Sequence, residues 1–319
     1  MKQFFKEMRL MFFLCAMILI ISSFKPFGSQ ANEIYIGQVG ANVTVTIVQD
    51  GQNNRISTKS TAQSPATLYG KNQTITFTQT GDNNKIGLYK HYYGSDNQTS
   101  SIMTATQTGD NNIMYLDNHG DNNNFDAYQL HNNAVMDLEI DYDGNSVMAK
   151  QACSATSCNR DTMILNIYQA DDNNVKMGQG YKIDGSGNFS YDNLEMGGHT
   201  MDLYITGDRN DVMLAQRSSN NTSGHNQDIN IFSDDNDVHI IQEHNSSKSL
   251  TLTLNNDDNN VDIDQKKNYS HSATVTLGGN YGTDFSLQQG SSQGTSAQSY
   301  SLNQNCQTSG GCSVSVTQY

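Results

Sequence analysis

The sequence contains no tryptophan, only 2 prolines and little apolar material, since 35% of its 319 residues are hydrophobic. So small an apolar fraction excludes a thick globular core. The β-branched and aromatic residues are nevertheless spaced too regularly for a disordered chain. The composition therefore favours a thin core that is built one repeat at a time.

Basic residues are also scarce, with 18 Lys and Arg against 32 Asp and Glu. Residues 1–31 hold four basic residues and one acidic residue, so removing them takes the net charge from −14 to −17. This balance argues against binding to nucleic acid, which needs Lys and Arg to neutralise phosphates. It also argues against attraction to anionic lipid and suits a well-solvated extracellular surface.

The N-terminal residues have the pattern of a secretory signal peptide. Lys2, Lys6 and Arg9 precede an apolar run over residues 10–21, and the small residues Ser29 and Ala31 follow it. The run is shorter than the roughly 20 residues that span a bilayer. We therefore expect residues 1–31 to be cleaved, and residues 32–319 to be exported as one repeat domain without membrane insertion.

The cysteines outside the signal peptide form two close pairs, Cys153 with Cys158 and Cys306 with Cys312. Close spacing in an exported chain predicts two local disulfides. Loops so short constrain the unfolded chain little, so each disulfide would pin a loop tip. Neither pair has a His pair or a second Cys pair at zinc spacing, which disfavours a metal site.

A repeated motif runs through the rest of the sequence. "VTIVQDGQNNRIST", "TITFTQTGDNNKIGLYK" and "IMTATQTGDNNIMYLD" carry Gln, Gly and Asn-Asn at the same offsets. Further along, the persistent pattern is Asn, any residue, an apolar residue, three residues and Gln. Its six full matches begin at Asn123, Asn145, Asn173, Asn210, Asn236 and Asn259, and Asn54, Asn84 and Asn112 begin three partial matches.

Residues two apart in a strand share a face, so the Asn, the apolar residues and the Gln of each motif point inward together. Before the turn, Ile75, Phe77 and Gln79 share one face, and Thr residues occupy the other. A single hairpin cannot bury such a stripe, whereas a stack of hairpins can. We predict an all-β solenoid of stacked strand-turn-strand repeats, in which two parallel sheets face each other across a thin core.

The predicted solenoid has about 10 rungs of about 22 residues each, and about 4.8 Å per rung makes it on the order of 50 Å long. The excess residues are expected to form rim loops at 60–72, 90–100, 152–160, 180–199, 217–226 and 289–299. A buried amide is costly alone. Stacked on its own kind, it can donate to one neighbour and accept from the other.

The motif Gln-x-Gly-x-x-Asn-x-apolar-x3-Gln, in an acidic and proline-poor exported chain, resembles the curlin repeat of curli, the functional amyloid fibres of bacterial biofilms. "QVGANV" and the closing "VSVTQY" look like the first and last repeats of that family. The resemblance implies a cell-surface fibre of a Gram-negative bacterium that grows by self-association. It also implies export through the periplasm and an outer-membrane secretion channel, and a curli-type nucleator as partner.

By this resemblance the stacked amides are the assembly positions. They are Gln38, Asn42, Gln49, Asn54, Gln79, Asn84, Gln107, Asn112, Asn123, Gln129, Asn145, Gln151, Gln169, Asn173, Gln179, Asn210, Gln216, Asn236, Gln242, Asn259, Gln265 and Gln318. The chain departs from the family pattern in three ways: it is long, its rim loops are large, and it has cysteines. A minor, capping or adhesive subunit therefore stays open beside the main fibre subunit.

Other functions remain as alternatives. A line of turn Asp residues such as Asp82 and Asp110 could bind Ca2+, although solvated turn residues are favoured because no Gly-Gly-x-Gly-x-Asp repeat occurs. Outward Thr pairs are also found on ice-binding solenoids, but Thr is an ordinary strand residue and the array is interrupted.

No enzyme and no cofactor are expected, because the sequence lacks a nucleophile motif, a phosphate loop and a carboxylate pair, and its eight His lie in stretches that we interpret as solvated turns and loops. The main alternative to a fibre is a monomeric adhesin. Its long loops carry Tyr92, Tyr93, Tyr181 and Tyr191, which could stack on surface glycans or on host matrix.

Overall fold

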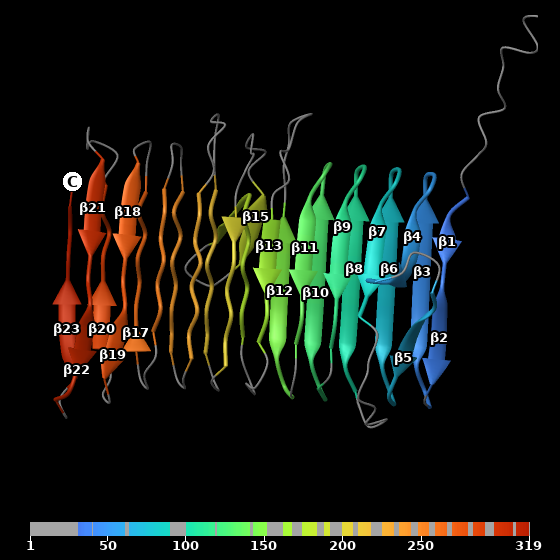
Figure 1. Ribbon diagram of the computed structural model, residues 1–319, viewed down its shortest axis with the longest axis horizontal. Helices are drawn as coiled ribbons and strands as arrows, with labels where there is room; N and C mark the ends of the chain where they lie inside the picture. Colours follow the sequence, from blue (N-terminus) through green and yellow to red (C-terminus); the bar gives the residue numbers. More distant parts are fainter. Residues whose placement is uncertain are drawn as a thin grey trace, which may run out of the picture.

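The computed structural model is an all-β chain whose strands lie side by side along one long axis, from the N-terminal to the C-terminal rungs (Figure 1). It describes residues 31–39, 41–60, 64–89, 100–118, 120–140, 143–151, 162–167, 174–183, 188–191, 200–206, 210–217, 225–232, 236–243, 248–254, 259–266, 270–279, 283–290, 297–308 and 311–318. Within these ranges no helix has the length and apolar character needed to cross a membrane. The predicted signal peptide, apart from Ala31, lies outside them.

The first sheet contains the strand that follows the turn in each repeat, and all its pairings are parallel. Its strands are β1 (Glu33–Ile34), β4 (Arg55–Thr58), β7 (Lys85–Leu88), β9 (Ile113–Leu116), β11 (Val135–Leu138), β13 (Thr162–Leu165) and β16 (Thr200–Met201). Parallel bridges through Asn226 and Ser249 continue it to β18 (His271–Thr274) and β21 (Gln298–Ser301).

The second sheet contains the strand that precedes each turn and is parallel as well. It begins with β3 (Thr44–Asp50), β6 (Thr74–Thr80), β8 (Ile102–Thr108), β10 (Asn124–Leu130) and β12 (Ser146–Gln151). Bridges through Asn174, Asp211 and Asp237 lead on to β17 (Asn259–Asn260), β20 (Thr283–Ser286) and β23 (Cys312–Ser315). Each sheet thus has eleven levels, against the about 10 rungs predicted.

Smaller pairings correct two of the predicted rim loops. The stretch 60–72 contains β5 (Ala66–Tyr69), which pairs with β2 (Ile36–Val39). The stretch 180–199 contains an antiparallel hairpin of β14 (Tyr181–Ile183) and β15 (Phe189–Tyr191). Near the C-terminus, β19 (Leu277–Gly279) pairs in parallel with β22 (Gln304–Cys306). Regular pairing therefore extends into two regions that the sequence reads as loops.

The core is the thin layer between the two sheets, as the alternation of residues predicts. Ile75, Phe77 and Gln79 are at most 3% exposed, while Thr74 on the same strand is exposed. Leu250, Leu252, Leu254 and the interior residues of the other levels form one continuous apolar cluster. The predicted solenoid of two facing parallel sheets is therefore confirmed.

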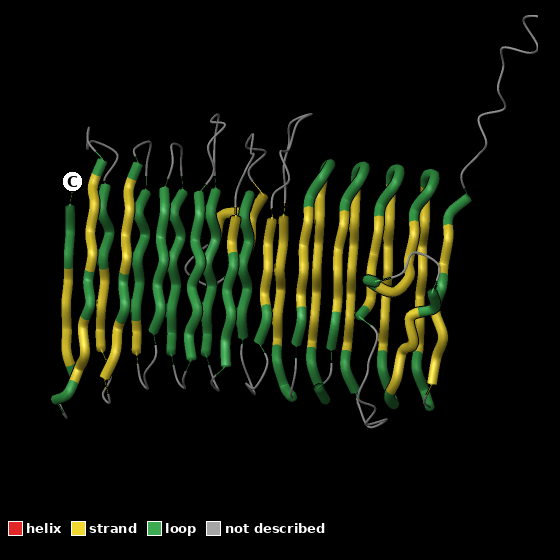
Figure 2. Tube along the Cα trace, in the orientation of Figure 1, coloured by secondary structure: helices red, strands yellow, loops and turns green. Residues whose placement is uncertain are grey.

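The middle of the chain departs from regular strand geometry. Figure 2 shows its traces running parallel to the neighbouring strands but without strand assignment, and each level keeps only a single bridge. The φ angles of Met177, Leu214 and Ile240 are 74°, 55° and 42°. Extended backbone is needed for continuous pairing, so these left-handed residues interrupt the ladders. The sequence pattern does not predict this interruption.

The turns between the two sheets stack as closely as the strands do. Gly51, Gly81 and Gly109 have φ angles of 111°, 102° and 107°, and a side-chain carbon on Gly81 would collide with the Gly109 carbonyl. The following Asn53 and Asn83 have φ angles of 57° and 59°, which Asn tolerates better than most residues. Glycine is therefore required at these turns by both its backbone angle and the adjacent turn.

We expect Gly81→Ala to lower the free energy of unfolding by about 1–3 kcal/mol, because it adds left-handed strain and a backbone collision. Gly37→Ala is the matched control, since the nearest atom to its added carbon is 3.7 Å away and its φ angle is not left-handed. The control should change stability by less than about 1 kcal/mol. Equal urea midpoints for Gly81→Ala and the unmodified chain would contradict the stacked turns.

Candidate functional site: amide columns and open ends

A column of glutamines runs through the second sheet and is called here the Gln column. Its members lie in register at the end of each second-sheet strand. They are Gln49, Gln79, Gln107, Gln129, Gln151, Gln179, Gln216, Gln242, Gln265, Gln289 and Gln318. All of them except Gln49 and Gln318, which lie at the two ends, are at most 1% exposed.

Each amide group in the N-terminal half of the column bonds along the stack and across the core. The Gln79 Nε2 donates to Gln107 Oε1 at 2.9 Å, and the Gln107 Nε2 donates to Gln129 Oε1 at 2.8 Å. The second hydrogen of each Nε2 reaches a backbone carbonyl of the first sheet, as from Gln107 to Lys85 at 3.0 Å. One side chain therefore links its rung to the next rung and the second sheet to the first.

The direction of donation reverses in the C-terminal half. There the Nε2 of Gln216 donates back to Gln179 Oε1 at 2.7 Å, and Gln318 donates back to Gln289 Oε1 at 2.7 Å. Gln151 lies between the two halves, and its buried Oε1 has no hydrogen-bond partner in the structure. The two halves thus point their donors toward the middle of the solenoid.

The asparagines that the sequence treats as one series belong to two different sheets, which corrects that interpretation. Asn54, Asn84 and Asn112 begin strands of the first sheet. Asn123 and Asn145 precede strands of the second sheet. The spacing from Asn to the first apolar residue is the same in both sheets, so the sequence alone does not separate them. Their different sheets explain why the three early copies lack the final Gln.

The first-sheet asparagines bond to backbone atoms rather than to each other. The Asn84 N–H donates to Asn54 Oδ1 at 2.9 Å, and the Asn54 Nδ2 donates to the Gly81 carbonyl at 2.7 Å. The same pair of bonds recurs at Asn84 and Asn112. These side chains therefore hold the turn of the following rung in place.

The second-sheet asparagines use mixed contacts. The Asn145 N–H donates to Asn123 Oδ1 at 2.8 Å, and the Asn210 Nδ2 donates to Asn236 Oδ1 at 2.8 Å. Asn259 is buried in the same series, whereas Gln169 and Asn173 lie outside the described residues. These contacts stack the strand entries of the second sheet.

One predicted ladder position is misplaced, and the prediction missed four buried amides, Gln73, Asn118, Gln227 and Gln289. Gln38 is exposed and pairs with Leu68. Asn42 lies in an exposed turn with a φ angle of 57°, and its Nδ2 donates to Asn72 Oδ1 at 3.1 Å, so this amide does stack on one of the next rung. Gln289 belongs to the Gln column, but Thr283 stands at the motif position that Asn occupies in the other repeats. A motif that also allowed Thr at this position would have found Gln289. Gln73 is 5% exposed and precedes β6, where no repeated Asn marks it.

The turn aspartates bind backbone N–H groups. The Asp82 Oδ1 accepts from the Gln52 N–H at 2.8 Å, and the Asp110 Oδ1 accepts from the Asp82 N–H at 2.8 Å. Among the described residues, no three His, Cys, Asp or Glu side chains are grouped to hold a metal ion. The structure thus gives these two carboxylates a turn-stacking role.

The disulfide predictions have different outcomes. Cys306 and Cys312 form a disulfide with a Cα–Cα distance of 5.9 Å, which joins β22 to the last strand. Cys153 and Cys158 lie outside the described residues. The confirmed disulfide holds the end of β22 to the start of β23 in the final rung.

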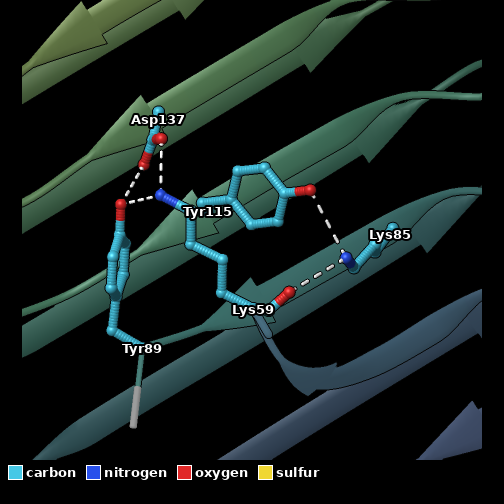
Figure 3. Close-up of polar contacts among 5 residues, drawn as sticks. All are labelled: Lys59, Lys85, Tyr89, Tyr115 and Asp137. Atoms are coloured by element: carbon cyan, nitrogen blue, oxygen red, sulfur yellow. Dashed lines mark hydrogen bonds and ion pairs between the residues drawn. The ribbon is translucent and has the colours of Figure 1, made fainter. Parts of the chain in front are cut away.

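On the outer face of the first sheet, Lys59, Tyr89, Tyr115 and Asp137 form a clamp across four levels (Figure 3). The Lys59 ammonium lies 2.7 Å from Asp137 Oδ2 and 3.9 Å from the Tyr89 ring centroid. The Tyr89 hydroxyl donates to Asp137 Oδ1 at 2.7 Å. Gly87 leaves room for the Tyr115 ring, because an added carbon there would lie 2.6 Å from that ring.

Acidic side chains stack on the outer faces of the middle rungs. Burial raises the pKa of the Asp211 carboxyl, Lys176 opposes this rise, and Asp237 adds to it. Burial and Asp228 likewise raise the pKa of Asp202. An acid whose pKa is raised on folding gains protons in the folded state, so acidification toward about pH 4 relieves this repulsion and favours folding.

In the middle levels, the inward apolar residues of each level pack between the levels on either side. In the two end levels, this apolar stripe has a neighbouring level on one side only. Val43, Val45 and Ile47 at the N-terminal end are partly buried against the core. Tyr300, Leu302, Val314 and Val316 at the C-terminal end are partly buried in the same way. β3 and β23 are edge strands of the second sheet. Within the described ranges, the two ends therefore leave apolar stripes partly exposed beside edge strands to which no further strand pairs.

We expect Gln107→Ala to destabilise the chain strongly, because it leaves the Gln79 amide and the Gln129 oxygen without their partners. Each buried group left unpaired costs about 1–3 kcal/mol. Thr106→Ala changes the outward neighbour on the same strand and should cost less than about 1 kcal/mol. Equal losses in urea unfolding would contradict the inward role of the Gln column.

A comparison of the chain with protein-family models, curated proteins and solved structures finds no match. The functional argument therefore starts from two features of the described residues. They are the Gln column that links the rungs and the partly covered stripes at the two ends.

Proposed function

We propose that this chain is an exported structural subunit that polymerises end to end into an extracellular cross-β fibre of the curli type. The observation that carries the proposal is the incomplete burial of the interior stripe at both ends, next to the edge strands β3 and β23. In the solenoid, each level is covered by a nearly equivalent level. A second copy of the chain fits an open end best, because its own end has the same width, the same apolar stripe and a glutamine at the same position.

The two ends match in register. Ser313 is the counterpart of Asp284 in the level below, and Gln318 donates to Gln289. Extending this pattern by one level aligns Ser313 with Thr44, and Gln318 with Gln49, of the next copy. Val314 and Val316 then lie against Val45 and Ile47. Head-to-tail contact of this kind does not close on itself and gives an open filament.

Soluble proteins usually protect such edges. Charged side chains, proline, bulges or a covering helix are the common devices. The last strand and its extension, residues 312–318, contain neither proline nor a charged side chain. This absence of a blocking residue supports assembly at the C-terminal end.

The proposal includes the route and the partners that the curlin resemblance implies. Residues 1–31 would direct export to the periplasm, followed by passage through an outer-membrane channel and assembly on a surface nucleator. The chain is proposed to act in the biofilm matrix and in surface adhesion. The role is structural, without a cofactor and without enzymatic activity.

A monomeric or minor-subunit adhesin is the second candidate, and an exposed aromatic pair favours it. The Tyr204 and Phe232 rings meet edge to face at 5.5 Å on the outer face of the first sheet, and Phe232 is 38% exposed. Such rings can stack on sugars. Of the loop tyrosines expected to bind glycans, Tyr92 and Tyr93 lie outside the described residues, and the backbones of Tyr181 and Tyr191 pair in a hairpin.

Purified residues 32–319 are expected to form sedimentable fibres after a lag, with a diffraction spacing of about 4.8 Å along the fibre. Val314→Lys should lengthen the lag at least several-fold, because it places a charge on the open apolar stripe. Ser315→Lys adds the same charge to the adjacent outward position of β23 and should have a much smaller effect.

Circular dichroism of the freshly purified chains controls for folding. A chain that stays monomeric for days at high micromolar concentration and moderate salt would overturn the fibre proposal. In that case, retention on immobilised polysaccharide, lost in Phe232→Ala, would support the adhesin.

A further inference from the structure

The first-sheet asparagines belong to a longer column at one corner of the solenoid, called here the corner column. In register with them are Ala134 and, nearer the C-terminus, His225, Lys248, His271 and Gln298. The Asn226 N–H donates to the Lys248 carbonyl at 3.0 Å, and the Ser249 N–H donates to the His271 carbonyl at 3.1 Å. These backbone bonds place the three titratable residues on consecutive levels.

The three side chains are buried. His225, Lys248 and His271 are 2%, 1% and 1% exposed. This corrects the prediction that the histidines are solvated loop residues. The column therefore places two imidazoles and one lysine on three consecutive levels about 4.8 Å apart, in a corner that water barely reaches.

His271 takes over the acceptor role that asparagine has elsewhere in the column. The Gln298 N–H donates to His271 Nδ1 at 3.3 Å, just as the Asn84 N–H donates to Asn54 Oδ1. A nitrogen that accepts a hydrogen bond cannot carry a proton. This contact therefore requires a neutral imidazole, and protonation at Nδ1 would turn an acceptor into a donor that faces another donor.

The neighbouring charges come from the second-sheet strand ends, and both signs occur among them. Glu243, in the level of Lys248, is the acidic neighbour, whereas Arg217 and Lys266 occupy the same strand position in the adjacent levels. Lys266 pairs with Asp264. Gly290 follows β20 and packs close to the His271 ring. His199, which precedes β16 in the sequence, His244 and Lys267 lie outside the described residues.

Lys248 shows how strongly this corner resists charge. Burial lowers the pKa of its ammonium to about 8, although the Glu243 carboxylate acts to raise it. Near neutral pH the ammonium is therefore still mostly protonated. Any proton added to an imidazole of the column places a second cation in a neighbouring level, with little solvent to screen it.

We propose that the His225, Lys248 and His271 column is an acid-sensitive switch, in which protonation of the imidazoles below about pH 6.5 opens the rungs around residues 225–279. In the opened chain, imidazole takes up a proton with a pKa of about 6.5. The closed column excludes that proton, so the opened form binds more protons at low pH. The column's contribution to stability is therefore complete only above about pH 7.5 and is lost as the pH falls through about 6.5.

This switch is distinct from the acid response of the outer-face carboxylates. Asp202 and Asp211 have raised pKa values, so their protonation favours folding on acidification. The histidine effect has the opposite sign and falls between about pH 7.5 and 5.5. The inference holds whether or not the chain polymerises, because it concerns levels within one molecule.

Amide hydrogen exchange of soluble residues 32–319 at pH 7.5 and 5.5, corrected for intrinsic rates, tests the switch. Protection of peptides within 225–279 should fall by up to about tenfold per imidazole, whereas peptides within 44–88 should not change. In His225→Asn/His271→Asn the fall should disappear. Asparagine keeps the acceptor that it supplies at Asn54 and Asn84 but cannot titrate.

Two further variants keep the test decisive. His271→Gln copies the residue in the next level, Gln298, and serves if the double asparagine variant fails to fold. His239→Asn removes a histidine from the outer face, where it acts on Asp262, and should leave the acid response in place. An unchanged loss of protection at pH 5.5 in a folded variant lacking the column histidines would overturn the switch.

Discussion

The glutamine side chain has two amide hydrogens and one oxygen, and the solenoid uses them in different directions. Gln107 receives a hydrogen from Gln79, gives one to Gln129 and gives the other to the Lys85 carbonyl in the opposite sheet. A buried amide without these partners would cost about 1–3 kcal/mol for each group left unpaired. The register of the rungs, the spacing of the two sheets and the burial of the thin core all depend on this pattern.

The reversal at Gln151 has a consequence for the ends. Because both halves donate toward the middle, the Oε1 atoms of Gln49 and Gln318 accept no hydrogen bond from the described residues. In a head-to-tail contact these two oxygens would face each other. If the side-chain amides of one half turned around, all the glutamines would donate in one direction, through Gln151 and across the contact between copies. The buried Gln151 oxygen would then have a donor. If copies dock head to tail as proposed, this one column would link docking to internal pairing.

The sequence predicts the features that depend on local periodicity. The alternation Ile75, Phe77, Gln79 identifies the inward face, and the structure confirms it. It does not separate the two sheets, because Asn54 and Asn123 begin the same local spacing on opposite sides of the core. That distinction depends on which strand pairs with which, and pairing is set by contacts between residues about 22–37 positions apart.

The corner column is hidden from the sequence for a related reason. His225 and His271 follow stretches rich in Ser, Asn and Lys, which indicate solvated loops. Only the register of the first sheet shows that they occupy the position of Asn54 and Asn84. The left-handed residues of the middle rungs are likewise invisible in the pattern, because Met177 and Leu214 are ordinary apolar residues at inward positions.

The most direct test of end-to-end stacking is a crosslink across the joint between copies. Thr46 and Ser315 are exposed, point outward, and would face each other if Gln49 of one copy stacks on Gln318 of another. Neighbouring strands at about 4.8 Å are close enough for a disulfide. Fibres grown from a mixture of Thr46→Cys and Ser315→Cys chains should give oxidised dimers that contain one chain of each kind. Fibres without such dimers, or with only like-to-like dimers, would contradict head-to-tail assembly.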